Sequence, residues 1–309
     1  MNLSCIPIYK PAGIRSTALV SQVKRILNTK KIGHTGTLDS FAEGILLLLI
    51  GPATRLSEIC MKQKKTYRAL IRFGITTDTL DPYGIPRVVP VYPQAHQIFE
   101  AVDTLTGVIT QRPPIYSALK IDGNRYSDLA RKGILIEPVP RNVRIYDAKL
   151  LYASHYEAFI ELTVSKGTYI RSYARSLAEQ WGGVAHVKRL QRVSLGAFHI
   201  SESYTLQSLE KELEKNTLRK HSLTYLLQNL HITKLLLNPI GEKKALQGAE
   251  LHQQDIHDPN QFVAQALEKS SSKKLQESIY AVACSRDNSI HILIRFYKGH
   301  FRYRRLDIL

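Results

Sequence analysis

A polar, glycine-punctuated loop that runs straight into an apolar strand constrains this chain more than any other feature. The apolar run extends from Ile45 to Ile50 and ends at Gly51. A short continuous run of this kind, bounded by a turn residue, is typical of a buried strand. The loop before it, from Gly33 to Gly44, includes an imidazole at His34 and a carboxylate at Asp39. Catalytic groups tend to lie on loops held by a rigid element, so we expect functional side chains here.

The remaining periodicity indicates a mixture of helices and strands. Tyr67 to Phe73 and Tyr156 to Val164 alternate with a period of two, as half-buried strands do. Apolar residues recur at helical spacing from Leu19 to Leu27, and Ser16 or Thr17 is the expected N-cap of this helix. Because strands and helices do not alternate regularly, we predict an α+β fold with a mixed or antiparallel sheet.

The composition of the chain changes near residue 202. Residues 205–230 are rich in Leu, Lys and Glu at helical spacing, and strand-like runs follow over residues 278–285 and 289–297. We therefore predict one domain over residues 1–230 and a small, mainly β C-terminal domain over residues 231–309.

The net charge points to a polyanionic partner. The chain has 43 Lys and Arg residues against 26 Asp and Glu residues, a formal charge of +17. A basic surface can serve solubility alone, but an excess this large favours nucleic acid as the partner.

Other classes of protein fit the sequence less well. The longest apolar run is far shorter than a membrane-spanning helix requires, so no membrane association is expected. Cys5, Cys60 and Cys284 are scattered and lack the spacing of metal ligands. They fit a reducing cytosol without structural disulfides, and we expect each to be a small buried side chain.

Seven short blocks of the first 200 or so residues follow one another in an order known from one family. They are Lys10-Pro11-Ala12-Gly13, Gly33-His34-Thr35-Gly36-Thr37-Leu38-Asp39, Gly51-Pro52-Ala53-Thr54-Arg55, Lys65-Thr66-Tyr67-Arg68, Pro114-Ile115-Tyr116-Ser117-Ala118-Leu119-Lys120, Ser165-Lys166-Gly167-Thr168-Tyr169-Ile170-Arg171 and His186 to Leu190. In this order they resemble the motifs of the tRNA pseudouridine synthase B (TruB) family. The resemblance implies a pseudouridine synthase catalytic domain.

The resemblance implies three catalytic residues, and each has a simpler alternative. Asp39 would be the covalent nucleophile, although an isolated Asp in a loop is most often a turn or helix cap. Arg171 would supply the counter-charge that keeps a desolvated carboxylate ionised; otherwise it is a solvated charge on a helix. Tyr67 would stack on a base extruded from the RNA, where the alternative is a core aromatic.

The resemblance also implies residues that bind the substrate. His34 would occupy the space of the flipped nucleotide, and Tyr169 and Leu190 would shape the base pocket, although core packing explains these two nearly as well. Lys10 and Arg55 are candidate phosphate contacts. Further candidates for phosphate contact are Lys24, Arg25, Lys30, Lys31, Lys64 and Lys65.

The implied activity is isomerisation of uridine to pseudouridine in tRNA, at position 55 of the T-loop, by a monomer in the cytoplasm that needs no cofactor and no metal. The C-terminal domain would be an RNA-binding domain of the PUA kind. Attack on the sugar carbon and attack on a carbon of the uracil ring are both compatible with this sequence. Two rivals stay open: a non-catalytic RNA-binding or chaperone module, and the catalytic subunit of a guide-RNA-dependent pseudouridylation particle.

Overall fold

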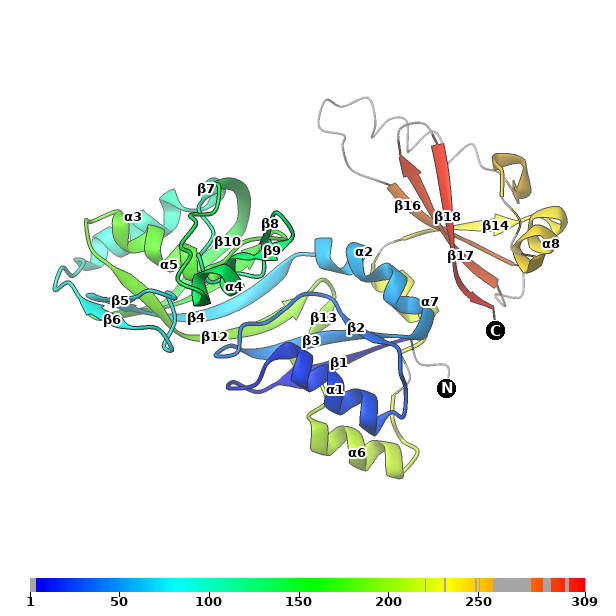
Figure 1. The fold of residues 1–309 in the computed structure, drawn as a ribbon, viewed down its shortest axis with the longest axis horizontal. Helices are drawn as coiled ribbons and strands as arrows, with labels where there is room; N and C mark the ends of the chain where they lie inside the picture. Colours follow the sequence, from blue (N-terminus) through cyan, green and yellow to red (C-terminus); the bar gives the residue numbers. More distant parts are fainter. Residues whose placement is uncertain are drawn as a thin grey trace.

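The computed structural model describes residues 4–308 apart from residues 220, 231, 248, 250, 258–278, 286–289 and 298–299. Its largest element is a mixed sheet in the order β1-β3-β12-β4-β11-β10-β7, with β2 paired to β3 and β13 paired to β12 (Figure 1). The strands are β1 (Cys5–Lys10), β2 (Ile32–His34), β3 (Glu43–Ile50), β4 (Lys65–Phe73), β7 (Gly107–Gln111), β10 (Arg141–Ala153), β11 (Glu157–Val164), β12 (Ala185–Leu195) and β13 (Phe198–His199).

The pairing of β3 with β12 is the parallel step in this otherwise antiparallel sheet. It depends on Gly44, whose φ is +112°. A Cβ atom at Gly44 would lie 2.3 Å from the carbonyl oxygen of Arg192. Only glycine therefore allows the two backbones to approach so closely.

The predicted strand Ile45 to Ile50 lies inside β3 and is buried on both of its faces. Leu47 and Leu49 belong to a core cluster shared with helix α7 (Leu223–Asn229), whereas Leu46 and Leu48 belong to a cluster shared with helix α1 (Ser16–Ile26). The apolar run lacks alternation because neither face of β3 meets water.

Helices and short elements surround the sheet. They are α1 (Ser16–Ile26), η1 (Gly51–Leu56), α2 (Ser57–Lys62), α3 (Ala95–Thr104), α4 (Tyr126–Arg131), α5 (Ile170–Glu179), η2 (Ile200–Glu202), α6 (Leu206–Glu214) and α7 (Leu223–Asn229), with the two-stranded pairs β5 (Ile75–Thr77)/β6 (Pro86–Val88) and β8 (Lys120–Ile121)/β9 (Asn124–Arg125). The α+β class predicted from the sequence is confirmed.

Helices α3 and α5 bury one face of β4 and β11. Tyr67, Ile71 and Phe73 of β4 share a core cluster with Ile98 of α3 and Leu177 of α5. Because side chains alternate along a strand, the intervening residues of β4 point to the opposite, open face of the sheet.

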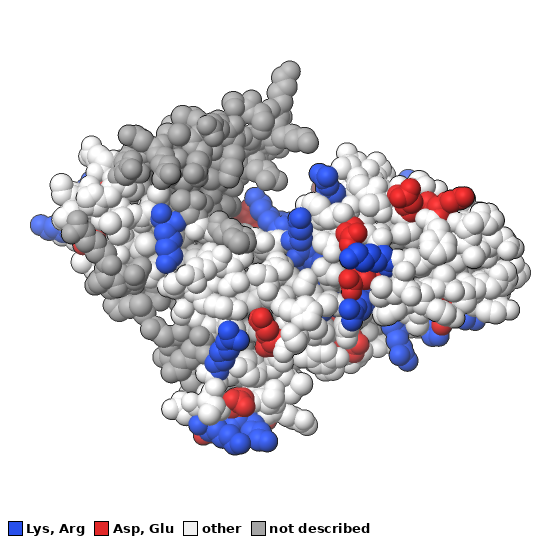
Figure 2. All heavy atoms as spheres, turned by 180° about the vertical axis from the view of Figure 1, so that it is seen from behind, with Lys and Arg blue, Asp and Glu red and all other residues white. Residues whose placement is uncertain are grey.

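Paired charges cover this open face. Arg68 lies 2.8 Å from Glu161, and Lys188 lies 3.2 Å from Glu157. A groove of about 410 Å³ runs beside them, lined by Glu43, Arg68, Leu70, Tyr152, Phe159, Arg189, Leu190 and Gln191. In the view from behind, basic and acidic side chains are interleaved over the middle of the molecule rather than gathered by sign (Figure 2).

Beyond α7 the chain forms a second, smaller sheet in the order β15-β14-β16-β17-β18. Its elements are β14 (Thr233–Leu237), α8 (Pro239–Gln247), η3 (Gln253–Asp255), β15 (Ile256–His257), β16 (Ile279–Cys284), β17 (Ile290–Tyr297) and β18 (His300–Ile308). Val282 and Leu293 of this sheet pack in one core cluster with Leu226 and Leu227 of α7. The boundary at residue 230 stays a prediction.

Within the described ranges, no helix has the length and apolarity needed to cross a membrane. The same residues contain no group of three or more His, Cys, Asp or Glu side chains placed to hold a metal ion. Cys5, Cys60 and Cys284 are free and buried, as expected, and burial raises the pKa of the Cys60 thiol to about 12.

Candidate active site

The loop between β2 and β3 is clamped on both sides of Asp39. The Ser16 hydroxyl donates to the carbonyl oxygen of Leu38 at 2.9 Å and accepts from the Leu38 N–H at 3.0 Å. On the other side, the N–H of Gly13 donates to the carbonyl oxygen of Ser40 at 2.7 Å. The backbone that carries the carboxylate is therefore fixed before any ligand binds.

This use of Ser16 corrects the prediction that Ser16 or Thr17 caps the first helix. Helix α1 begins at Ser16 itself, and the cap position is Arg15, which makes no side-chain capping hydrogen bond. Ser16 is only 3% exposed, and its hydroxyl bonds to the loop instead. The Ser16 hydroxyl thus makes a tertiary contact with Leu38, where the local sequence predicts that it caps the helix.

Lys10 is also part of the clamp, and this corrects its predicted role as a phosphate contact. Its side chain is fully buried. The ammonium donates to the carbonyl oxygens of Pro11 (3.0 Å), Ile14 (2.8 Å) and Ser40 (3.4 Å), so its three N–H groups face carbonyls rather than solvent. Lys65 is buried in the same way, with donations to Met61 and Gln63.

Both buried lysines make the free energy of unfolding depend on pH. Burial lowers the pKa of Lys10 and of Lys65 from the ordinary 10.5 to about 8. Between these pH values the unfolded chain binds more protons than the folded one. The free energy of unfolding therefore rises as the pH increases from about 8 to 10.5.

We predict that Lys10→Met reduces this rise and lowers kcat about tenfold, because the Ser40 carbonyl next to Asp39 loses a charged donor. Urea unfolding at pH 7.5 and 9.5 measures the first effect, and single-turnover kinetics at saturating substrate measures the second. Lys65→Met is the matched control: it should reduce the rise similarly but keep kcat within about twofold. An equal loss of kcat in both variants would contradict the prediction that the contact of Lys10 with Ser40 supports Asp39.

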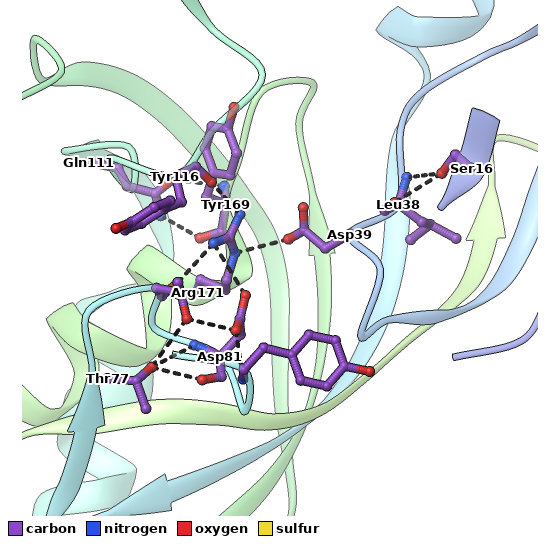
Figure 3. A network of polar contacts seen from close by, with 11 residues as sticks. Ser16, Leu38, Asp39, Thr77, Asp81, Gln111, Tyr116, Tyr169 and Arg171 are labelled. Carbon is purple, nitrogen blue, oxygen red and sulfur yellow. Dashed lines mark hydrogen bonds and ion pairs between the residues drawn. The ribbon is translucent and has the colours of Figure 1, made fainter. Parts of the chain in front are cut away.

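Arg171, in the first turn of α5, lies at the centre of the polar network (Figure 3). Its Nε atom forms an ion pair with Oδ2 of Asp39 at 2.9 Å. Its Nη1 donates to the carbonyl oxygen of Thr79 at 2.8 Å, and its Nη2 donates to that of Tyr116 at 3.0 Å. The guanidinium side chain is 4% exposed, whereas that of Asp39 is 36% exposed. A buried cation thus holds a carboxylate that is still open to a ligand.

Asp81 completes the network, and sequence reasoning did not select it as a site residue. Its Oδ2 lies 3.5 Å from Nη1 of Arg171, and its Oδ1 accepts from the Thr79 hydroxyl and the Tyr83 N–H. The segment Asp81-Pro82-Tyr83-Gly84 is typical of a turn. A role in the turn accounts for Asp81 by itself, so the pattern does not indicate its contact with Arg171. One signal in the sequence could have pointed to Asp81 as a site residue: the polar side chains of Asp78, Thr79 and Asp81 lie close together in the chain.

Tyr67 and Leu190 lie in the core cluster that contains Leu38, the residue before Asp39. Tyr67 is 8% exposed and Leu190 is 7% exposed. Tyr67 is on β4 and Leu190 on β12, and these strands are neighbours in the sheet. The structure thus brings both residues toward the loop from the sheet beneath it.

Tyr169 precedes α5 and is held through its backbone. Its N–H donates to the Gln111 side chain at 2.8 Å, and its carbonyl oxygen accepts from the same amide at 3.1 Å. The Arg141 guanidinium lies 5.3 Å from the centre of its ring. Burial raises the pKa of the Tyr169 hydroxyl, which favours the neutral phenol as a hydrogen-bond donor.

His34 lies on β2, opposite Leu48 of β3. Burial, with the Arg192 guanidinium nearby, lowers the pKa of its imidazole, so the ring is neutral at pH 7. Arg192 is itself 1% exposed and donates to the carbonyl oxygens of Ile45 (2.8 Å) and Gly36 (3.2 Å). This buried arginine, which sequence reasoning left without a role, holds the loop against the strand that follows it.

Arg55 lies apart from this cluster. It belongs to η1, which follows the end of β3 farther from Asp39, and it is exposed. The other candidate phosphate contacts, Lys24, Arg25, Lys30, Lys31 and Lys64, are exposed or partly exposed. They lie outside the Asp39 network and can meet only parts of a large ligand that extend beyond the site.

Comparison with known proteins agrees with this geometry. The model of the TruB family pseudouridylate synthase N-terminal domain matches residues 24–170. The tRNA pseudouridine synthase B of Clostridioides difficile is 40% identical over 252 residues, which cover 80% of this chain and 83% of that protein. The protein of the same name from Treponema denticola is 41% identical over 218 residues, and the match covers 64% of this chain but only 61% of that protein.

Among solved structures, the fold resembles one described as a Cbf5-Nop10-Gar1 complex. The TM-score is 0.68 at 21% identity, and the match covers 100% of this chain and 84% of the other. This likeness concerns the fold. The resemblance predicted from the seven sequence blocks is confirmed by the relatives at about 40% identity: the chain belongs to the TruB family of pseudouridylate synthases.

Proposed function

We propose that this chain isomerises uridine to pseudouridine in tRNA, at position 55 of the T-loop, as a cytoplasmic monomer. The observation that carries the proposal is the ion pair between the partly exposed Asp39 carboxylate and the buried Arg171 guanidinium, on a loop clamped by Ser16 and Gly13. The names of relatives at about 40% identity support the substrate.

In the proposed reaction Asp39 is the nucleophile. It attacks either the sugar carbon C1′ or a carbon of the uracil ring, and the bond between N1 and C1′ breaks. The base turns within the pocket and rejoins C1′ through its C5 atom, and the bond to Asp39 breaks, which returns the free carboxylate. C5 then loses a proton and N1 gains one. The product has the composition of the substrate, so the reaction consumes no oxidant, reductant or water.

Arg171 keeps this nucleophile anionic in a partly buried place. Desolvation alone favours the neutral acid, which is a poor nucleophile, and an adjacent cation opposes that effect. Asp81 shares the same guanidinium, so the pair of carboxylates fixes the orientation of Arg171 as well as its charge. Asp81 is therefore proposed as a positioning residue.

The remaining predicted residues are proposed to hold the extruded nucleotide. The Tyr67 ring would stack on the uracil, with Tyr169 and Leu190 as further walls, and the neutral His34 would fill the space that the base leaves in the RNA. Arg55, with the exposed lysines before β2, would contact phosphates. The smaller sheet is proposed as an RNA-binding, PUA-like domain that adds contact area.

Two rivals make different predictions. A non-catalytic RNA-binding module would not require Asp39, Tyr67 and Arg171 around one loop, and this arrangement favours the enzyme. A guide-RNA-dependent subunit would need partner chains. The relatives at about 40% identity are named tRNA pseudouridine synthase B, whereas the Cbf5 likeness has 21% identity, which favours an enzyme acting alone.

The test is to incubate the purified chain alone with unmodified tRNA transcripts and to map pseudouridine at single-nucleotide resolution. One pseudouridine per tRNA, at position 55, is expected. A tRNA that stays unmodified unless guide RNA and partner proteins are added would overturn the proposal in favour of the particle subunit. Binding without modification under both conditions would favour the non-catalytic module.

Affinity for tRNA should fall steeply with salt, because lysine and arginine contacts release counterions from phosphates. Replacing the exposed Lys30 and Lys31 with alanine should raise Kd and lower the slope of log Kd against log salt by about 1 to 2. Filter binding from 50 to 300 mM salt measures both. Lys149→Ala with Lys188→Ala, the same charge change on the open face of the sheet, is the control, and an equal effect there would refute localised binding.

A further inference from the structure

Two aromatic rings accompany the two carboxylates that share Arg171. Phe41 follows Asp39 by two residues, and Tyr83 follows Asp81 by two residues. The rings meet edge to face, with centroids 6.5 Å apart and an angle of 82° between their planes. The ring of Tyr83 is therefore adjacent to the loop that carries the nucleophile.

The two rings differ sharply in exposure. Phe41 is 6% exposed and belongs to the core cluster that contains Tyr67. Tyr83 is 63% exposed, so the buried ring supports an outer ring whose surface is largely free. Pro82 and Ile85, on either side of it, are also exposed, which extends the apolar surface along the chain.

The backbone around Tyr83 is rigid. The N–H of Tyr83 donates to Oδ1 of Asp81 at 3.0 Å, and the N–H of Ile85 donates to Oδ1 of Asp78 at 2.7 Å. A Cβ atom on Gly84 would lie 2.3 Å from Oδ1 of Asp78, so the turn closes tightly on this side chain. The exposed ring is thus held in place before a ligand arrives, which lowers the entropic cost of using it as a contact.

We propose that Tyr83 is a stacking surface for a nucleobase next to the extruded uridine. The inference rests on the proposed function. Extruding one nucleotide leaves its neighbours without a stacking partner. A flat, exposed ring fixed beside the nucleophile's loop provides a replacement, and every base has a π face that it can accept. Tyr83 would then favour RNA in which the target uridine is already flipped.

Affinity and turnover distinguish stacking from a merely structural role. Tyr83→Ser should raise Kd for unmodified tRNA about tenfold and leave single-turnover kcat within about threefold. Tyr83→Phe keeps the ring and should restore the affinity. Tyr152→Ser is the matched control, because Tyr152 is 55% exposed but lines the groove on the open face; its Kd should not change. A loss of kcat without a change in Kd for Tyr83→Ser would overturn the proposal.

Crosslinking tests the contact even if Tyr83→Ser folds poorly. A T-stem-loop with 4-thiouridine on either side of the target is irradiated with Asp39→Asn, which should bind without turnover. Trypsin releases residues 73–87 as one peptide, since Arg72 and Arg87 flank it. An adduct on Tyr83 in that peptide is expected from at least one neighbour. No adduct from either position, with normal pseudouridine formation by the unaltered chain, refutes this inference alone; no pseudouridine formation by that chain refutes the proposed function.

Discussion

Asp39→Asn is expected to lower the rate of pseudouridine formation by about 10⁴-fold or more, while Kd for tRNA changes less than about threefold. The amide has nearly the same size and shape as the carboxylate. The clamp on the loop uses backbone groups of Leu38 and Ser40, so it does not depend on the Asp39 side chain. The variant lacks the anion, so the proposed covalent step should be lost.

Single-turnover kinetics on unmodified tRNA, together with filter binding, separates the two quantities. Asp103→Asn is the control, since Asp103 is an exposed residue of α3 outside the polar network. Turnover of Asp39→Asn close to that of the unaltered chain would refute Asp39 as the nucleophile. A large rise in Kd at unchanged kcat would instead give Asp39 a binding role.

Arg171→Lys is expected to lower kcat about 10² to 10³-fold and also to destabilise the fold. A lysine keeps the positive charge, but its point-like ammonium cannot reach Asp39, Asp81 and the two carbonyls that the guanidinium spans. Each buried acceptor that is left without a donor lowers the free energy of unfolding by about 1 to 3 kcal/mol. The change is therefore expected to affect both the orientation of the proposed nucleophile, Asp39, and the stability of the fold.

Arg175→Lys provides a matched control one turn further along α5. Arg175 is 31% exposed, donates to the carbonyl oxygen of Arg112 at 2.8 Å and pairs loosely with Glu179. Its replacement should leave kcat within about twofold. Thermal unfolding with and without tRNA shows whether Arg171→Lys is folded under the assay conditions. Equal kcat values for Arg171→Lys and Arg175→Lys would refute the prediction that Arg171 orients Asp39.

The sequence predicted the elements whose patterns are local. The apolar run of β3 and the alternation in β4 and β11 depend on neighbouring residues, and the structure contains these elements. The order of the seven blocks identified the family, because a series of motifs in one order is specific where each alone is weak. Asp39 and Arg171 could be named before their contact was known.

The basic C-terminal segment shows where local patterns are ambiguous. Residues 302–305 are a run dominated by charge, which is as typical of a tail as of a strand. In the structure they lie within β18, the edge strand of the smaller sheet, paired to β17. Pairing with a neighbouring strand, rather than an apolar pattern, makes this segment a strand.

Only the tertiary structure decided which polar groups serve the site and which serve the fold. Lys10 and Arg55 are both basic residues within family motifs, yet Lys10 is buried under the loop that carries Asp39 and Arg55 is exposed beyond β3. Asp81 belongs to a turn by sequence and contacts Arg171 across 90 residues of chain. Such roles depend on burial and on partners far away in sequence, because a polar group removed from water must find its hydrogen bonds wherever the fold places them.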